Sequence, residues 1–171
     1  MIFTMKRIAL LALISSLLFS IFSCSQKKES ESIGEIKTAP YFILSDLNGK
    51  MVSIKDFNGK VLILNFWATW CFPCREEIPN FQDLYAQYKS KGLEIIGISL
   101  DEGGSDVLKT FVKDYRISYP ILIGNEEVTN VYGGIRGIPT TFVINRKGDI
   151  IKKYIGYTDK ETFEQDVKPL L

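Results

Sequence analysis

An apolar run that leads directly into a pair of cysteines constrains this chain more than any other feature. Val61 to Leu64 are apolar and β-prone, and Cys71 and Cys74 follow at a spacing of three. A helical pattern begins at these cysteines. A Cys-x-x-Cys pair between a strand and a helix is typical of a redox-active dithiol. We therefore expect the fold to be organised around this pair.

Two other readings of the cysteine pair stay open, a purely structural disulfide and half of a metal site. A structural zinc site takes four nitrogen or sulfur ligands. The chain has no histidine and only one further cysteine, Cys24. We therefore expect no metal and no cofactor. The net charge of +1, with acids and bases interspersed, gives no signal for nucleic acid.

The N-terminus has the pattern of a secretion signal. Lys6 and Arg7 precede a weakly polar to apolar run over residues 8–22. This run is short for a bilayer span but suits a signal-peptide core. We expect residues 1–23 to be a signal peptide. An uncleaved anchor and ordinary secretion are the alternatives to the lipoprotein signal considered next, and all three place the domain outside the cytoplasm and on or near a membrane.

A small residue followed by Cys24, directly after the apolar run, resembles a bacterial lipobox. The resemblance implies that Cys24 is lipidated and anchors the chain to a membrane, in the periplasm or on the outer cell surface. Residues 24–39 are mostly polar and lack apolar periodicity, so we expect a flexible tether. The folded domain is then expected over residues 40–171.

Strands and helices alternate along that domain, which predicts an α/β fold with a central sheet and helices on both faces. The first two strands are expected to form a hairpin. Thr158 and Glu161 have capping-box spacing at the start of the last helix. The expected strands are 41–44, 51–53, 61–67, 93–100, 119–123, 141–144 and 149–154. The expected helices are one from Cys71 to Gly92, 107–115, 126–132 and one from Thr158.

Two segments together resemble a known family. Residues 66–74 resemble the thioredoxin active-site segment, and residues 132–142 resemble its second signature, in which Pro139 is the cis-proline. The spacing leaves room for an extra strand and helix within residues 101–123. With the N-terminal hairpin and the membrane address, the chain resembles the TlpA/ResA group of extracytoplasmic thioredoxin-like proteins. The resemblance implies a thioredoxin-like fold with a central mixed sheet.

The expected chemistry is thiol–disulfide exchange. Cys71 at the helix N-terminus is the expected nucleophile, because unpaired amides and the helix dipole favour its thiolate. Cys74 lies about one helical turn further on, within bridging range, so that the pair forms the Cys71–Cys74 redox disulfide.

The proton acceptor for Cys74 is less obvious. Thioredoxins keep a buried aspartate where this chain has Asn65, which cannot accept a proton at neutral pH. The resemblance to TlpA/ResA proteins points to Glu77, three residues after Cys74, as a catalytic residue. The alternative is that Glu76 and Glu77 are solvated acids near a helix N-terminus.

The substrate-binding residues expected from this comparison surround the dithiol. Pro139 would face the sulfurs, with the Ile138 backbone free to pair with a substrate segment. An apolar rim would dock protein substrates, and Trp67 fits this rim or the core equally well. The expected contacts are Trp70, Phe72, Pro73, Ile138 and Pro139.

The leading hypothesis is therefore a membrane-tethered, monomeric thiol–disulfide oxidoreductase that reduces disulfides in exported proteins. The resemblance suggests apocytochromes c among the substrates, and a membrane-embedded thiol protein as electron donor. A peroxiredoxin-like peroxidase is an alternative, although positions 64 and 68 lack the expected proline and hydroxyl residue. The other alternative is a non-catalytic surface lipoprotein with a structural disulfide.

Overall fold

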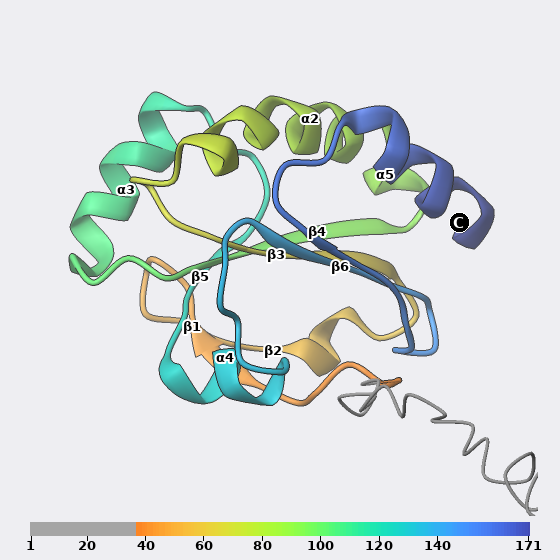
Figure 1. The fold of residues 1–171 in the computed structure, drawn as a ribbon, viewed down its shortest axis with the longest axis horizontal. Helices are drawn as coiled ribbons and strands as arrows, with labels where there is room; N and C mark the ends of the chain where they lie inside the picture. The colour runs from red at the N-terminus through yellow and green to blue at the C-terminus, as the bar shows by residue number, and fades with distance from the viewer. Residues whose placement is uncertain (1–36) are drawn as a thin grey trace, which may run out of the picture. The chain divides into compact units, whose positions relative to one another are not determined.

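The computed structural model describes residues 37–171. The predicted signal peptide, Cys24 and residues 25–36 of the predicted tether lie outside the described residues. The described part contains a five-stranded sheet, a two-stranded hairpin and helices on either side of the sheet (Figure 1).

The five-stranded sheet is mixed and is centred on β3 (Val61–Trp67), in the order β5-β4-β3-β6-β7. β3, β4 and β5 are parallel, whereas β6 is antiparallel to both β3 and β7. Every residue of β3 is buried, as expected for a central strand. The other strands are β4 (Leu93–Ser99), β5 (Ile121–Ile123), β6 (Thr140–Ile144) and β7 (Ile150–Ile155).

Helices cover both faces of this sheet, as predicted. Figure 1 shows α2 (Phe72–Tyr88), α3 (Gly104–Asp114) and α5 (Lys160–Val167) on one side. The other side carries α4 (Glu126–Val131) and the hairpin of β1 (Ile43–Ser45) and β2 (Met51–Ser53). The short 3-10 helices are η1 (Ile54–Phe57), η2 (Lys89–Lys91) and η3 (Lys168–Leu170).

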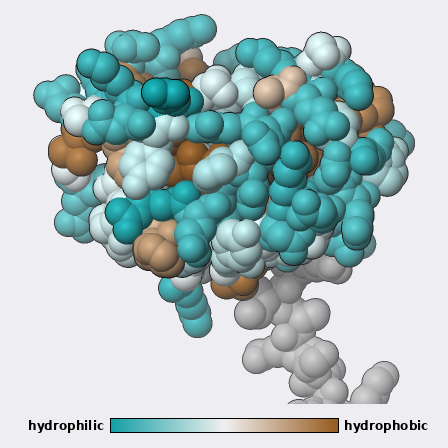
Figure 2. Space-filling model, turned by 90° about the horizontal axis from the view of Figure 1, so that it is seen from above, coloured by the Kyte–Doolittle hydropathy of each residue, from teal (hydrophilic) through white to brown (hydrophobic). Residues whose placement is uncertain are grey.

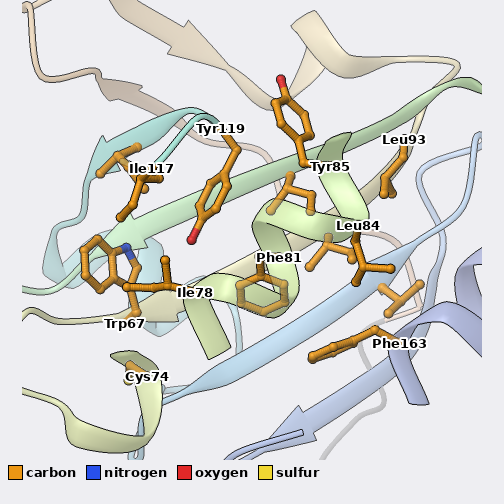
Figure 3. Packing of buried hydrophobic residues seen from close by; sticks show 14 of the residues in the cluster. Trp67, Cys74, Ile78, Phe81, Leu84, Tyr85, Leu93, Ile117, Tyr119 and Phe163 are labelled. Atoms are coloured by element: carbon orange, nitrogen blue, oxygen red, sulfur yellow. The ribbon is translucent and has the colours of Figure 1, made fainter. Parts of the chain in front are cut away.

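The core has two layers because successive side chains of a strand point to opposite faces. Ile63 and Trp67 of β3 pack in the layer under α2, and Leu64 and Phe66 pack in the other. Figure 3 shows Ile78, Phe81 and Leu84 of α2 directed into the first layer. The outer surface of these helices is mostly hydrophilic, with separate hydrophobic spots (Figure 2).

The predicted end of the tether is wrong by at least three residues. The backbone N–H of Ala39 donates to the Gly148 carbonyl at 2.8 Å, and that of Ile150 donates to the Lys37 carbonyl at 2.8 Å. Residues 37–39 therefore belong to the folded domain. The pairing of these residues has no sequence signal, because their hydrogen-bond partners lie more than a hundred residues away and the bonds involve backbone atoms only.

The predicted cap of the last helix is also wrong. Asp159 is the N-cap of α5, and its side chain accepts from the Thr162 N–H at 2.8 Å. Thr158 lies outside the helix, and its N–H donates to the Glu77 carboxylate. Aspartate caps a helix as well as threonine does, so local sequence alone did not separate the two positions. The other element boundaries differ from prediction by a few residues.

Within residues 37–171, no helix has the length and apolarity needed to cross a bilayer.

Candidate active site

Cys71 and Cys74 are joined by a disulfide at the N-terminus of α2, with 5.3 Å between their Cα atoms. Cys71 is the N-cap residue, and Pro73 occupies the first turn, where a proline is tolerated because its missing N–H would have no helical partner. The Cys71 Sγ accepts from the Cys74 N–H at 3.2 Å. In the reduced protein, the Cys74 N–H and the positive end of the helix dipole would both stabilise a thiolate on Cys71.

The expected aromatic rim is only partly where the sequence suggested. Trp70 and Phe72 are 69% and 62% exposed beside the disulfide. Trp67, in contrast, is 2% exposed and packs against Phe111, so it belongs to the core and not to the rim. The Arg75 guanidinium lies over the Phe72 ring, 5.7 Å from its centroid.

The loop before β6 carries the proline that was expected to face the dithiol. Its Ile138–Pro139 peptide bond is cis, Ile138 is half-buried and Pro139 is buried. Thr140 pairs with Phe66 at the end of β3, so this loop adjoins the strand end that leads to Cys71. The Pro139 carbonyl accepts from the Gly156 N–H at 2.8 Å.

Two exposed apolar side chains next to that glycine were missed by the sequence reasoning. Ile155 is 72% and Tyr157 is 51% exposed, and they flank Gly156. Their place beside Pro139 follows from the pairing of β7 with β6, which joins Ile155 to Thr140. An apolar residue that alternation places on the outside at a strand end is the only sequence signal they give.

Glu77 is fully buried, so the alternative of a solvated acid is wrong for this residue, although Glu76 is exposed. Its Oε1 accepts from the Thr158 N–H at 2.8 Å. Its Oε2 lies 3.5 Å from Asn65 Nδ2, which also donates to Thr141 Oγ1 at 2.8 Å. Asn65 thus lies next to the carboxylate as a hydrogen-bond donor.

Burial raises the pKa of Glu77 from 4.5 to about 8, because a desolvated carboxylate loses the stabilisation that water gives its charge. The Thr158 N–H opposes this rise in pKa but does not cancel it. An ordinary thiol has a pKa of roughly 8.5. Glu77 and a cysteine thiol can therefore exchange a proton near neutral pH at little cost.

A further carboxylate near the dithiol loop was missed by the sequence reasoning. Asp101 follows β4 and accepts from the Thr69 N–H at 3.0 Å, the Thr69 hydroxyl at 2.6 Å and the Ser99 hydroxyl at 2.7 Å. The available signal was topological. β3 and β4 are parallel neighbours, so the residues that follow them meet at one edge of the sheet.

No group of three or more cysteine, aspartate or glutamate side chains suited to a metal ion occurs between residues 37 and 171.

Comparison with known proteins agrees with this geometry. A profile described as the AhpC/TSA family matches residues 36–153. The thiol-disulfide oxidoreductase ResA of Bacillus thuringiensis subsp. konkukian (strain 97-27) is 42% identical over 146 residues, which cover 84% of this chain and 82% of that protein. ResA of Bacillus subtilis (strain 168) is 37% identical over 148 residues, which cover 86% of this chain and 81% of that protein.

The fold has a similar solved counterpart. The crystal structure of a thiol:disulfide interchange protein, a thioredoxin family protein from Chlorobium tepidum TLS, superposes with a TM-score of 0.71 and 36% identity. The match covers 78% of this chain and 95% of that chain. From the profile match, the relatives and this superposition, the chain belongs to the AhpC/TSA family of thioredoxin-like proteins and is a thiol–disulfide oxidoreductase.

Proposed function

We propose that this thiol–disulfide oxidoreductase is a membrane-tethered, extracytoplasmic reductant of disulfides in exported proteins. The observation that carries the proposal is the Cys71–Cys74 pair at the N-terminus of α2, with a buried carboxylate, Glu77, one turn after Cys74. The carboxylate gives the second cysteine a proton acceptor, which the reducing cycle requires.

In this cycle the Cys71 thiolate attacks one sulfur of a substrate disulfide and forms a mixed disulfide, releasing the other substrate sulfur as a thiolate. Cys74 then loses its proton and attacks the Cys71 sulfur. The substrate leaves with both cysteines reduced, and Cys71 and Cys74 are oxidised to the disulfide. Two electrons pass to the substrate, and the dithiol must be reduced again by an external thiol.

Glu77 is the proposed acceptor of the Cys74 proton. Its pKa of about 8 makes the ionised carboxylate a stronger base than a solvated glutamate, and brings it close to that of the thiol. The Thr158 N–H holds one carboxylate oxygen, and the Asn65 amide faces the other. Asn65 thus serves as a donor to the base, and Glu77 takes the part that the missing aspartate would play.

The proposed docking surface for the substrate is formed by exposed apolar side chains from two segments. Trp70 and Phe72 are the exposed chain neighbours of Cys71, and the exposed Ile155 and Tyr157 flank Gly156, which is hydrogen-bonded to Pro139. Pro73, Ile138 and Pro139 would complete the surface next to the sulfurs. An open apolar surface of this kind suits a protein segment better than a small molecule, which binds in concave sites.

The membrane part of the proposal rests on the N-terminal sequence. The apolar run at residues 8–22 followed by Cys24 supports a cleaved lipoprotein signal, and residues 25–36 supply a polar tether. The resemblance to the TlpA/ResA group supports apocytochromes c among the substrates and a membrane-embedded thiol protein as electron donor.

The decisive experiment is a Cys74→Ala trap in cells that make the full chain. Without Cys74 the mixed disulfide on Cys71 persists, so we expect partner adducts on non-reducing gels that disappear after reduction. The double variant Cys71→Ser/Cys74→Ala is the control and should trap nothing. Adducts that form equally well without Cys71, or none with an accessible Cys71, would overturn the proposal. Exported cysteine-containing proteins among the adducts would support the substrate class.

Two further measurements separate the alternatives. Cys24→Ser should move the chain from the membrane fraction to the soluble fraction, and an unchanged distribution would argue against a lipid anchor at Cys24. A peroxidase would consume hydrogen peroxide through Cys71. Leu64 and Ala68 are fully buried apolar residues, so the hydroxyl group that such an enzyme needs is missing there. We expect no peroxide consumption above that of the Cys71→Ser variant.

A further inference from the structure

The carboxylate of Asp101 is hydrogen-bonded to the loop that carries Cys71, yet it has no part in the cycle described above. It accepts the backbone N–H and the hydroxyl of Thr69, and also the hydroxyl of Ser99, at 2.6–3.2 Å. The Asp101 N–H in turn donates to the Ser99 hydroxyl at 3.1 Å. Each of these partners fixes the orientation of the carboxylate at the end of β4.

A second contact from the same strand end reaches the same loop. The Leu100 N–H donates to the Trp67 carbonyl at 2.8 Å. The end of β3 at Trp67 and the loop at Thr69 are therefore both held by the residues that follow β4. Within the loop, the Cys71 N–H donates to the Ala68 carbonyl at 3.2 Å.

Three hydrogen bonds along this short stretch of chain connect Asp101 to the region of the sulfur. Asp101 holds Thr69, the turn from Ala68 to Cys71 is closed by its own hydrogen bond, and the Cys71 Sγ receives the Cys74 N–H at 3.2 Å. That last donor stabilises a thiolate only while Cys71 stays in the N-cap position. A loop released at Thr69 would let Cys71 leave that position.

We propose that Asp101 is a positioning residue for Cys71. Through Thr69, it holds the loop so that the Cys71 sulfur stays against the N-terminus of α2, where its thiolate is favoured. This inference deepens the proposed function and rests on it, because it takes Cys71 as the attacking thiol.

The sign of one measurement distinguishes positioning from a simple charge effect. If Asp101 acted on Cys71 only through its negative charge, its neutralisation would favour the thiolate, because like charges repel. If Asp101 acts through the position of the loop, its neutralisation disfavours the thiolate. Loss of the Thr69 hydroxyl removes a positioning contact and leaves the charge in place, so it has an effect only in the second case.

The test follows alkylation of Cys71 by iodoacetamide against pH, in the full chain with Cys74→Ala and with the site of alkylation located by mass spectrometry. The variants are Asp101→Asn, Thr69→Val and Thr69→Ser. We expect the first two to raise the midpoint pH of alkylation by about half a unit, roughly threefold less thiolate below the midpoint. Thr69→Ser keeps the hydroxyl and should retain the wild-type midpoint.

Asp106→Asn is the matched control, because it also removes one carboxylate near the start of α3, from a side chain that is 95% exposed. It should leave the midpoint unchanged. A lower midpoint in Asp101→Asn, or equal midpoints for Thr69→Val and Thr69→Ser, would overturn the inference. If Asp101→Asn does not fold, as judged by near-ultraviolet circular dichroism, the comparison of the Thr69→Val and Thr69→Ser midpoints tests the inference.

The order in which the two cysteines are alkylated tests the proposed function separately from the role of Asp101. In the reduced wild-type chain, Cys71 should be alkylated before Cys74. The reverse order would overturn the assignment of Cys71 as the attacking thiol, whatever the variants show. The expected order together with unchanged midpoints would leave the cycle in place and reject the role of Asp101 alone.

Discussion

The carboxylate of Glu77 accepts a hydrogen bond of 2.8 Å from the backbone N–H of Thr158, a residue 81 positions later in the chain. Among residues 37–171, the only other hydrogen-bond donor to this carboxylate is the more distant Asn65 amide, at 3.5 Å. A buried carboxylate commonly needs two or three donors to keep a low pKa. Burial therefore raises the pKa of Glu77 to about 8, because the single short bond opposes this rise only in part.

The raised pKa predicts that the oxidised protein becomes less stable as the pH rises. Below pH 4.5, Glu77 is protonated in both the folded and the unfolded chain. Between pH 4.5 and about 8 the folded state binds the proton more tightly, so the free energy of unfolding falls as pH increases. Each pKa unit is worth about 1.4 kcal/mol, so the fall is on the order of a few kcal/mol.

Urea unfolding of the oxidised protein at a series of pH values measures this fall. Glu77→Gln should remove it, because glutamine does not titrate. Glu76→Gln changes the exposed neighbour on the same helix and is the matched control, with a profile parallel to that of the wild type. If Glu77→Gln also ran parallel to the wild type, Glu77 would not have the pKa given above.

The proton-acceptor role predicts a kinetic effect of the same substitution. Glu77→Gln should slow the attack of Cys74 on the mixed disulfide by about a hundredfold, a common contribution of a positioned general base. The first step, attack by Cys71, should change much less. Rapid-mixing measurements of tryptophan fluorescence, with a preformed mixed disulfide on Cys71, follow the second step alone. Equal rates for Glu77→Gln and Glu76→Gln would remove Glu77 from the mechanism.

The apolar docking surface predicts that protein and small-molecule substrates respond differently to its truncation. Phe72→Ala and Ile155→Ala should each raise the KM for a protein disulfide such as insulin by about fivefold, equivalent to roughly 1 kcal/mol of apolar contact. Reduction of oxidised glutathione should be almost unaffected. Met51→Ala, at a residue 59% exposed on the β1–β2 hairpin, is the control. Equal losses with both substrates would indicate damage to the dithiol and not to docking.

The packing below the dithiol predicts a steric effect at Gly97. A methyl group on Gly97 would lie 2.6 Å from Ile121 Cδ1 and 2.8 Å from Trp67 Nε1, inside van der Waals contact. Trp67 Nε1 is buried and has no hydrogen-bond partner among the described residues, so the indole is placed by packing alone. Gly97→Ala should therefore lower the free energy of unfolding by about 1–3 kcal/mol, the usual cost of overpacking.

Urea unfolding at one pH tests this prediction. Gly137→Ala is the control, because its methyl group would have Ile155 Cγ2 as nearest neighbour at 3.9 Å, an ordinary contact. A Gly97→Ala protein as stable as the control would show that the core around Trp67 can adjust.

The central part of the fold was predictable because its signals are local. The continuous apolar run of β3 and the spacing of Ile78, Phe81 and Leu84 on α2 depend only on periodicity, and the structure has both elements where predicted. The Cys71–Cys74 pair is recognisable by its spacing alone. These features are fixed by residues that lie close together in sequence.

The surroundings of the dithiol were less predictable because they depend on backbone atoms and on distant partners. Thr158 looked like a helix cap, yet its N–H serves Glu77. Asp101 looked like part of a loop, yet its carboxylate holds Thr69. A backbone donor carries no sequence signature, and the partner of a carboxylate 32 residues away is defined only once the strands are paired.

The backbone pairing of residues 37–39 with the turn around Gly148 also determines where a pull on the chain is felt. Because β6 runs antiparallel to β3, this turn lies at the Val61 end of β3, opposite Cys71. If the chain is anchored upstream of Lys37, tension enters the domain at the end of β3 opposite the disulfide. Two backbone hydrogen bonds then carry the load. The dithiol, at the opposite end of β3, is left unloaded and available to partners in solution.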